Sequence, residues 1–169
     1  MALDWKYATV CFLRREGKTL FIDYTNYQHP IHEGFYAPPW GKIEDDEDPI
    51  QTTIRELEEE TGIILKSVVY RGLIKFDNEE RKIKGKPFKH NFEVHIYDCY
   101  DFDDSNARAT EGHLAWIDDM SVLSLPLHES DKELWRWLTQ YKEVYGTIKE
   151  NEEILESAVI DKFVPLGQS

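Results

Sequence analysis

GKIEDDEDPIQTTIRELEEETGI, residues 41–63, is the stretch around which the rest of the chain is organised. Its order Asp48-Pro49-Ile50-Gln51 predicts the start of a helix, because it supplies a capping carboxylate, a first-turn proline and the glutamine of a capping box. Gly62 predicts the end of that helix, because glycine readily adopts the left-handed backbone of a helix C-cap. We therefore expect a helix between Asp48 and Gly62.

Three glutamates share one face of this helix, because Glu56, Glu59 and Glu60 follow the spacing i, i+3, i+4. They lie in the last turns, where the helix dipole disfavours negative charge, and each like-charged i,i+4 pair costs roughly 0.2–0.5 kcal/mol. A bound cation would offset this repulsion, and clustered carboxylate oxygens suit Mg²⁺ or Mn²⁺ better than zinc. The alternative is a solvated acidic face. Another face is expected to form an apolar stripe, with Ile50, Ile54 and Leu57.

The composition predicts one soluble domain. A chain of 169 residues with 41% hydrophobic residues can bury one core, so we expect a single domain over residues 1–169. Its core would span about 6–143, and a closing β hairpin would span about 145–163. The chain has neither an apolar run long enough to cross a bilayer nor the pattern of a signal peptide at its amino terminus. These features predict a cytoplasmic protein without membrane contact.

The acidic balance of the chain restricts its partners. A net charge of −13 repels polyanions, which disfavours binding to bulk DNA or RNA. A small phosphorylated substrate remains compatible, because divalent cations held by the glutamates would reverse the sign of the local field. Cys11 and Cys99 lie in apolar runs without a CxxC pattern, so we expect two buried free thiols.

The order of the predicted elements indicates an α/β fold. Period-2 alternation and turn residues predict strands on both sides of the first helix, and the stretch after Gly62 is expected to bend near Gly72. A second helix is predicted over residues 128–141, with Leu134, Trp135 and Leu138 facing the core. The predicted strands are residues 6–14, 19–24, 63–76, 91–100 and a hairpin within 145–163. This order predicts a mixed β-sheet between helices, an α/β/α sandwich.

Two polar loops are expected to lie in solvent. TNYQHPIHEG, residues 25–34, contains His29, His32 and Glu33, whereas DNEERKIKGKPFK, residues 77–89, is basic and forms a hairpin loop. In both loops the alternative to a solvated surface is contact with the sugar or phosphates of a nucleotide.

The fixed positions of the first stretch resemble the Nudix box, G-x5-E-x7-R-E-U-x-E-E-x-G-U, where U is aliphatic. The match comprises Gly41, Glu47 and the run Arg55 to Ile63, at every fixed position. The box covers only 23 residues, but it is a specific enzyme signature. The resemblance implies a Nudix fold and a hydrolase that cleaves a diphosphate bridge with the help of a divalent cation, Mg²⁺ with Mn²⁺ as a substitute.

The resemblance also implies roles for residues of the box. Glu56, Glu59 and Glu60 would be metal ligands, with Glu56 also a candidate general base that takes a proton from water. Arg55 would orient Glu56, and Glu47 would support the cluster. The backbone carbonyl of Trp40 would join the metal ligands.

From about Tyr7 to Phe163 the chain is similar to MutT-like enzymes, the 8-oxo-dGTP diphosphatases. This resemblance implies roles for residues outside the box. Glu111, five residues before Trp116, is similar to their supplementary carboxylate, which acts as a metal ligand or a base. His128 and Asp131 at the start of the second helix would contact the purine. Lys42 would meet phosphate, and Tyr36 belongs to the segment expected to influence substrate choice.

Two positions depart from the pattern. Trp40 stands where most relatives have glycine, and Ala37 stands where some oxidised-purine enzymes have a base-reading asparagine. We expect hydrolysis of a nucleoside triphosphate, first 8-oxo-dGTP, to the monophosphate and pyrophosphate. The alternatives are hydrolysis of ADP-ribose, a dinucleotide or another diphosphate, and nucleotide sensing without turnover. The resemblance implies a monomer or a homodimer.

Overall fold

The computed structural model describes residues 2–152 and 154–167. The chain divides into two compact units, each made of segments that are distant in the sequence. We call them the hairpin unit, formed by Met1–Ala8, Tyr70–Ile96 and His128–Ser169, and the α1 unit, formed by Thr9–Val69 and Tyr97–Leu127. Three long strands contribute residues to both units: β1 (Asp4–Arg15), β5 (Ile64–Asp77) and β8 (His90–Asp103).

Strand β2 (Lys18–Asp23) organises the sheet of the α1 unit. It pairs antiparallel with β1 across the predicted turn, with Arg14 opposite Thr19, and antiparallel with β3 (Tyr36–Ala37). It also pairs antiparallel with β9 (His113–Asp118), where Leu20 lies opposite Trp116. Strand β4 (Trp40–Lys42) pairs with β1, and the 3₁₀ helix η1 (Asp119–Ser124) follows β9. The buried residues Leu20 and Phe21 place the core of this unit under β2.

The hairpin unit contains the closing hairpin predicted from the sequence. Strand β10 (Tyr141–Asn151) pairs antiparallel with β11 (Ile154–Pro165), from Tyr141 opposite Pro165 to Asn151 opposite Ile154. Strand β10 also pairs parallel with β5, from Val144 opposite Gly72 to Lys149 opposite Asp77. Parallel and antiparallel pairs therefore meet at β10. The mixed α/β fold expected from the order of elements is confirmed.

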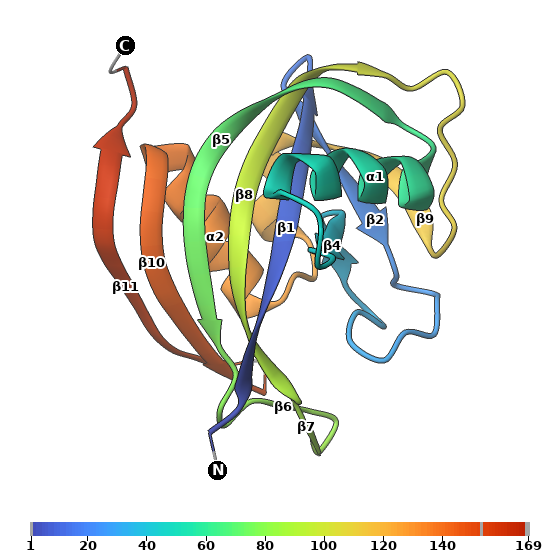
Figure 1. Ribbon diagram of the computed structural model, residues 1–169. Coiled ribbons are helices and arrows are strands. Elements are labelled where there is room, and N and C mark those ends of the chain that lie inside the picture. The colour runs from blue at the N-terminus through green and yellow to red at the C-terminus, as the bar shows by residue number, and fades with distance from the viewer. Residues whose placement is uncertain (1, 153, 168–169) are drawn as a thin grey trace. The chain divides into compact units, whose positions relative to one another are not determined.

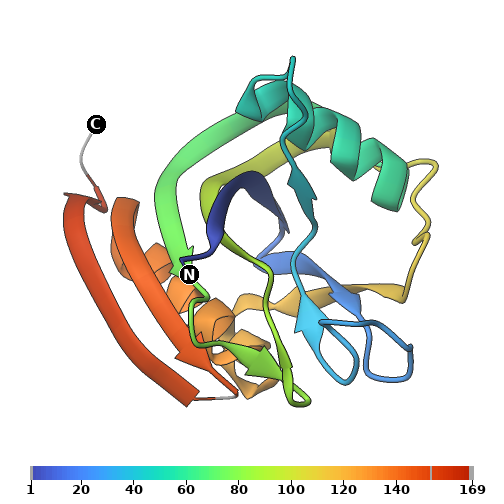
Figure 2. The ribbon, with the colours of Figure 1, turned by 60° about the horizontal axis from the view of Figure 1, so that its bottom comes forward.

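Helix α2 (Glu129–Gln140) packs along β10 in the hairpin unit (Figures 1 and 2). Leu134, Trp135 and Leu138 are buried as predicted. Gly146 of β10 lies at a close approach, because a Cβ atom there would lie 2.4 Å from the Val159 carbonyl oxygen of β11 and 3.1 Å from the Trp137 ring of α2. The basic loop forms the small hairpin of β6 (Lys82–Ile83) and β7 (Lys86–Pro87).

Helix α1 (Pro49–Thr61) begins and ends where the sequence predicts. The Asp48 side chain accepts from the Gln51 N–H at 2.8 Å, the Gln51 side chain accepts from the Asp48 N–H at 2.9 Å, and Gly62 is left-handed with φ +68°. The predicted apolar stripe is wrong, because Ile50 is 46% exposed and Ile54 is 37% exposed. The buried face consists of Leu57 and three threonines, Thr52, Thr53 and Thr61.

Hydrogen bonds made by the threonines explain why the buried face differs from the predicted apolar stripe. The Thr53 hydroxyl donates to the Pro49 carbonyl at 2.8 Å, and the Thr61 hydroxyl donates to the Leu57 carbonyl at 2.5 Å. Their polar atoms are therefore satisfied inside the helix, and their small methyl-bearing faces can be buried.

Other expectations concern single positions. Gly72, near which a bend was predicted, has φ +124° at the start of the β5–β10 pairing, a backbone conformation that glycine adopts readily. Cys11 and Cys99 are buried and free, as expected. In residues 2–152 and 154–167 no helix is long and apolar enough to cross a membrane.

We expect the stability of the hairpin unit to depend strongly on the side chain of Arg71. It is buried and donates to the carbonyls of Lys142 at 2.7 Å, Leu138 at 2.6 Å and Tyr141 at 2.9 Å. Arg71→Met should therefore lower the free energy of unfolding by about 3 kcal/mol, because buried carbonyls at the end of α2 lose charged donors. Denaturant unfolding measures this change.

The matched control is Arg136→Met on the same helix. Arg136 pairs with Glu133 at i,i+3, and its side chain is 43% exposed. Its replacement should change the free energy of unfolding by less than about 0.5 kcal/mol. Equal effects of the two substitutions would contradict the role assigned to Arg71.

Candidate functional site

The candidate site is built where α1 packs on β4. Both elements belong to the α1 unit, and Gly41 of β4 lies against the side chain of Glu56. A Cβ atom at position 41 would collide with Cγ and Cδ of Glu56. The glycine therefore lets the helix approach the strand until the Glu56 side chain lies on it. This contact gives the spacing between Gly41 and Glu56 a physical reason.

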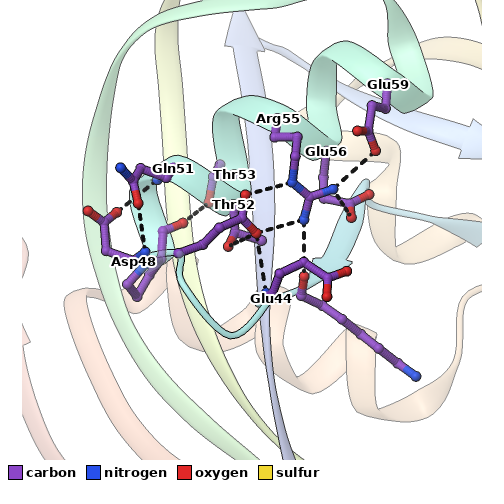
Figure 3. Close-up of polar contacts among 11 residues, drawn as sticks. Glu44, Asp48, Gln51, Thr52, Thr53, Arg55, Glu56 and Glu59 are labelled. Carbon is purple, nitrogen blue, oxygen red and sulfur yellow. Dashed lines mark hydrogen bonds and ion pairs between the residues drawn. The ribbon is translucent and has the colours of Figure 1, made fainter.

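Arg55 holds three carboxylates at the same time (Figure 3). Its Nε donates to Glu47 Oε2 at 2.6 Å, and its Nη2 donates to Glu47 Oε1 at 2.8 Å. Its Nη1 donates to Glu56 Oε1 at 2.8 Å and to Glu59 Oε2 at 3.1 Å. The Lys42 carbonyl accepts from Nη2 at 3.4 Å. Arg55 is thus directed at protein carboxylates, and its orienting role stays a prediction.

Glu47 is the strongest partner of Arg55. The bidentate hydrogen bonds from this guanidinium lower the pKa of Glu47 to about 2. The Thr52 hydroxyl at 3.1 Å and the Glu44 N–H at 3.2 Å also donate to Glu47. Glu47 is therefore fixed as a carboxylate that anchors Arg55.

Glu56 and Glu60 carry carboxyl groups whose ionisation is opposed. Burial raises the pKa of Glu56, although the hydrogen bond from Arg55 acts in the other direction. Burial, together with the charges of Glu56, Glu111 and Glu59, raises the pKa of Glu60 to about 8, although the Trp40 N–H donates to it. A positive charge at this place would favour the ionised form of both groups.

Glu111 reaches the same place from the loop before β9. The Arg108 N–H donates to the Thr61 carbonyl at 2.8 Å, and the Thr110 N–H donates to the Glu60 carbonyl at 3.1 Å. These bonds fix the loop to the end of α1. Gly112 has φ +64°, and a Cβ atom there would lie 2.7 Å from the Asp23 carbonyl. The Glu111-Gly112 pair therefore belongs to a close approach of β9 to β2.

Three of these carboxylates, those of Glu59, Glu60 and Glu111, line a pocket of the α1 unit. Its volume is about 290 Å³. The side chain of Glu111 is 54% exposed, so solvent and solutes can reach it. The lining residues are Ile22, Tyr24, Glu59, Glu60, Thr110 and Glu111.

The chemistry of this pocket fits a divalent cation. In the part of the chain that the structure describes, no three His, Cys, Asp or Glu side chains are already gathered as a coordination sphere. Two of the carboxylates, Glu56 and Glu59, are paired with Arg55. Glu60 Oε2 is nevertheless shielded from solvent and accepts no hydrogen bond from the described residues. An all-carboxylate donor set with one unsatisfied buried oxygen suits a hard cation such as Mg²⁺.

The remaining predicted residues lie in different places. Trp40 contacts Glu60 through its N–H, and the role predicted for its carbonyl stays a prediction. Lys42 is exposed beside the Arg55 cluster. Tyr36 makes a side-chain hydrogen bond with Asp23, and its N–H donates to the Pro126 carbonyl at 2.9 Å.

His128 and Asp131 belong to the hairpin unit. His128 is buried and precedes α2 without a side-chain capping bond. Burial and the charge of Glu150 raise the pKa of Asp131 to about 7, although Arg81 acts in the opposite direction. Arg81 was expected in solvent, and this is wrong: it is 8% exposed and pairs with Glu150 at 2.6 Å.

Two histidines in the loop after β2 were also expected in solvent, and this too is wrong. His29 stacks on His32 with ring centroids 4.8 Å apart, and Tyr24 lies 4.9 Å from His29. Burial lowers the pKa of His29. Its Nε2 lies 3.5 Å from Glu111 Oε2. In the sequence, the H-x-x-H spacing after an aromatic residue could have predicted this packed cluster.

Comparisons with known proteins agree with this geometry. A family model described as NUDIX domain matches residues 5–140. Similar solved structures include a MutT protein from Bacillus halodurans, which is 22% identical, with 92% of this chain and 97% of that chain covered and a TM-score of 0.73.

Two further structures show the same fold. A MutT NUDIX hydrolase from Burkholderia pseudomallei is 21% identical, with coverage of 79% of this chain and 97% of that chain and a TM-score of 0.60. The NUDIX domain of Shewanella oneidensis NrtR, in complex with ADP ribose, is 20% identical, with coverage of 82% and 88% and a TM-score of 0.56.

Gly41→Ala tests the contact between β4 and α1. The added methyl group would collide with Glu56, so we expect the free energy of unfolding to fall by about 1–3 kcal/mol, the usual cost of overpacking. Lys42→Ala at the exposed neighbouring position is the control and should change stability little. Urea unfolding compares the two, and an unchanged Gly41→Ala midpoint would contradict the close approach.

Asp131→Asn tests the buried carboxyl of the hairpin unit. Because the folded pKa of about 7 lies above the unfolded value, the native chain holds an extra proton between about pH 4 and pH 7. The stability of the wild type should therefore fall as the pH rises through this range. The variant lacks this loss and should be more stable than the wild type at pH 8, by about 1 kcal/mol or more.

Thermal unfolding at pH 5 and pH 8 measures the difference. Asp161→Asn on the exposed surface of β11 is the control, because it removes no buried charge. A constant difference between the Asp131→Asn variant and the wild type at both pH values would contradict the raised pKa.

Proposed function

We propose a function for this chain from one premise: it belongs to the Nudix family and is a Nudix pyrophosphohydrolase. Members of this family generally use divalent metal ions and act on small nucleotide substrates. We propose that the ion is Mg²⁺, with Mn²⁺ as a substitute, and that the reaction cleaves a nucleoside triphosphate to the monophosphate and pyrophosphate. The first candidate substrate is 8-oxo-dGTP.

One observation carries this proposal. Glu60 has a shielded, unpaired carboxylate oxygen beside Glu56, Glu59 and Glu111, and burial, together with the charges of these neighbours, raises the pKa of Glu60 to about 8. Such an arrangement opposes ionisation unless a cation is present. A cation there can in turn attract the negative phosphates of a nucleotide, which the net charge of −13 would otherwise repel.

The side chains have separable roles in the proposed reaction. When bound, Mg²⁺ neutralises phosphate oxygens and lowers the pKa of water near it. Glu56 takes the proton from the attacking water while a bond between phosphorus and the bridging oxygen breaks. Arg55 orients Glu56, and Glu47 anchors Arg55. Glu111 is the alternative proton acceptor. The proposed metal ligands are Trp40 through its carbonyl, Glu56, Glu59, Glu60 and Glu111.

The base preference is a separate part of the proposal. We assign phosphate contact to Lys42 and assign selection of the nucleotide to Tyr36, His128 and Asp131. A protonated Asp131 can donate a hydrogen bond, whereas an ionised one can only accept. The protein would act in the cytoplasm on free nucleotides, as a monomer or a homodimer, without contact with bulk nucleic acid or membranes.

A second candidate keeps the reaction and changes the substrate. The NrtR domain named above is complexed with ADP ribose, which contains the same diphosphate bridge. ADP-ribose, a dinucleotide or another nucleoside diphosphate derivative would then be cleaved. Nucleotide sensing without turnover is a weaker alternative, because all fixed positions of the Nudix box are present.

Glu56→Gln tests the proposed chemistry. The amide cannot accept the proton, so we expect kcat to fall by about 10²–10⁴-fold while the fold is retained. Glu58→Gln on the same helix is the matched control, because Glu58 is exposed and the hydrogen bonds of Arg55 go to Glu47, Glu56, Glu59 and the Lys42 carbonyl. Near-full activity of Glu56→Gln with Mg²⁺ would overturn the assignment of Glu56.

A nucleotide panel separates the candidate functions. The products of 8-oxo-dGTP, unmodified triphosphates, ADP-ribose and a dinucleotide are measured by chromatography with and without Mg²⁺. We expect pyrophosphate and a monophosphate from a triphosphate. Cleavage confined to ADP-ribose or the dinucleotide would favour the second candidate, and cation-dependent binding without products would favour sensing.

A further inference from the structure

The loop after β2 is closed at its base and contains a histidine aimed at Glu111. The Tyr24 N–H donates to the Phe35 carbonyl at 2.9 Å, and the Gly34 N–H donates to the Tyr24 carbonyl at 3.0 Å. All of these residues and Glu111 belong to the α1 unit. The loop therefore starts and ends at a fixed point of the sheet that also pairs with β9, which follows Glu111.

Two backbone donors determine the tautomer of His29. Its Nδ1 accepts from the Ile31 N–H at 3.1 Å and from the His32 N–H at 3.0 Å. A nitrogen that accepts these bonds carries no proton, so the proton of the neutral ring must be on Nε2. Nε2 is the atom that lies 3.5 Å from Glu111 Oε2. His29 therefore directs an N–H donor at one oxygen of Glu111.

The ring cannot easily turn away from this carboxylate. It packs against both Tyr24 and His32, with centroid distances of 4.9 Å and 4.8 Å, and these two rings also contact each other at 5.3 Å. The side chain of His29 is only 14% exposed. Glu111 alone is 54% exposed and would otherwise sample several rotamers. The distance of 3.5 Å is long for a hydrogen bond, but such contacts often shorten when the substrate complex forms.

We propose that His29 is a positioning residue for Glu111. By holding Oε2, it leaves Oε1 of Glu111 for the pocket that Glu60 and Glu59 also line. His29 transfers no proton in this role and touches no substrate. Carboxylates near metal sites are commonly oriented by such a partner, and its loss typically costs about 10–100-fold in affinity or activity. The importance of this contact for turnover rests on the proposed function, whereas the contact itself does not.

The His29→Asn substitution tests the role of Nε2 separately from that of Nδ1. The asparagine oxygen can replace Nδ1 as the acceptor for the Ile31 and His32 N–H groups, as in an Asx turn, but no group replaces Nε2. The loop should keep its fold, with an unfolding midpoint close to that of the wild type. His29→Ala, which removes both nitrogens, should also lower the midpoint.

The first readout is the side-chain nitrogen spectrum, measured by long-range proton–nitrogen NMR without cation or substrate. We expect His29 as the Nε2–H tautomer, with an Nε2 signal that shifts in the Glu111→Gln variant. The Nδ1–H tautomer, or a His29 signal indifferent to Glu111→Gln, would overturn the proposal. This measurement decides the contact even if no nucleotide is hydrolysed, so failure of the proposed function is recognised separately.

The second readout is a double-mutant cycle on the preferred nucleotide. His29→Asn should lower kcat about 10–100-fold. It should have no further effect when Glu111 is already glutamine, because the residue acts through that carboxylate. His113→Asn, an exposed histidine on β9, is the control and should leave kcat unchanged. Additive effects of His29→Asn and Glu111→Gln would overturn the positioning role.

Discussion

One guanidinium group holds the carboxylate-rich end of α1 together. Arg55 binds Glu47 through two donors and keeps a third for Glu56 and Glu59, so its positive charge offsets part of the repulsion between the carboxylates of this helix. Arginine suits this task because its planar donors match a carboxylate on one edge while another edge stays available.

Three glycines allow the close contacts between elements that form the pocket beside these charges. Gly41 lets Glu56 lie on β4, Gly62 ends α1 against the Asn106 carbonyl, and Gly112 brings β9 to the Asp23 carbonyl. Each position is one where a side chain would collide with backbone or with a carboxylate stem. Each of these glycines therefore marks a close contact between two elements. Together the contacts bring the acidic residues that lie between the glycines in the sequence to one place.

The sequence was sufficient wherever the determining contacts are local. The caps of α1, the order of strands and the buried residues of α2 follow from neighbouring residues, and they were predicted. The buried face of α1 was not, because hydroxyls that bond within the helix make threonine behave as a small apolar residue at Thr53 and Thr61. His29 and Arg81 were placed in solvent for a related reason: their partners, Glu111 and Glu150, are far away in the sequence.

The parallel pairing of β5 with β10 has a consequence for the order of folding. The β10–β11 hairpin closes through near neighbours, Asn151 and Ile154, whereas its attachment to β5 joins residues 72 and 144. Closing so long a loop costs more chain entropy than closing a hairpin turn. We therefore expect the hairpin and α2 to form early and the attachment to β5 to be a late, slow event. One edge of β5 then stays unpaired until β10 attaches to it.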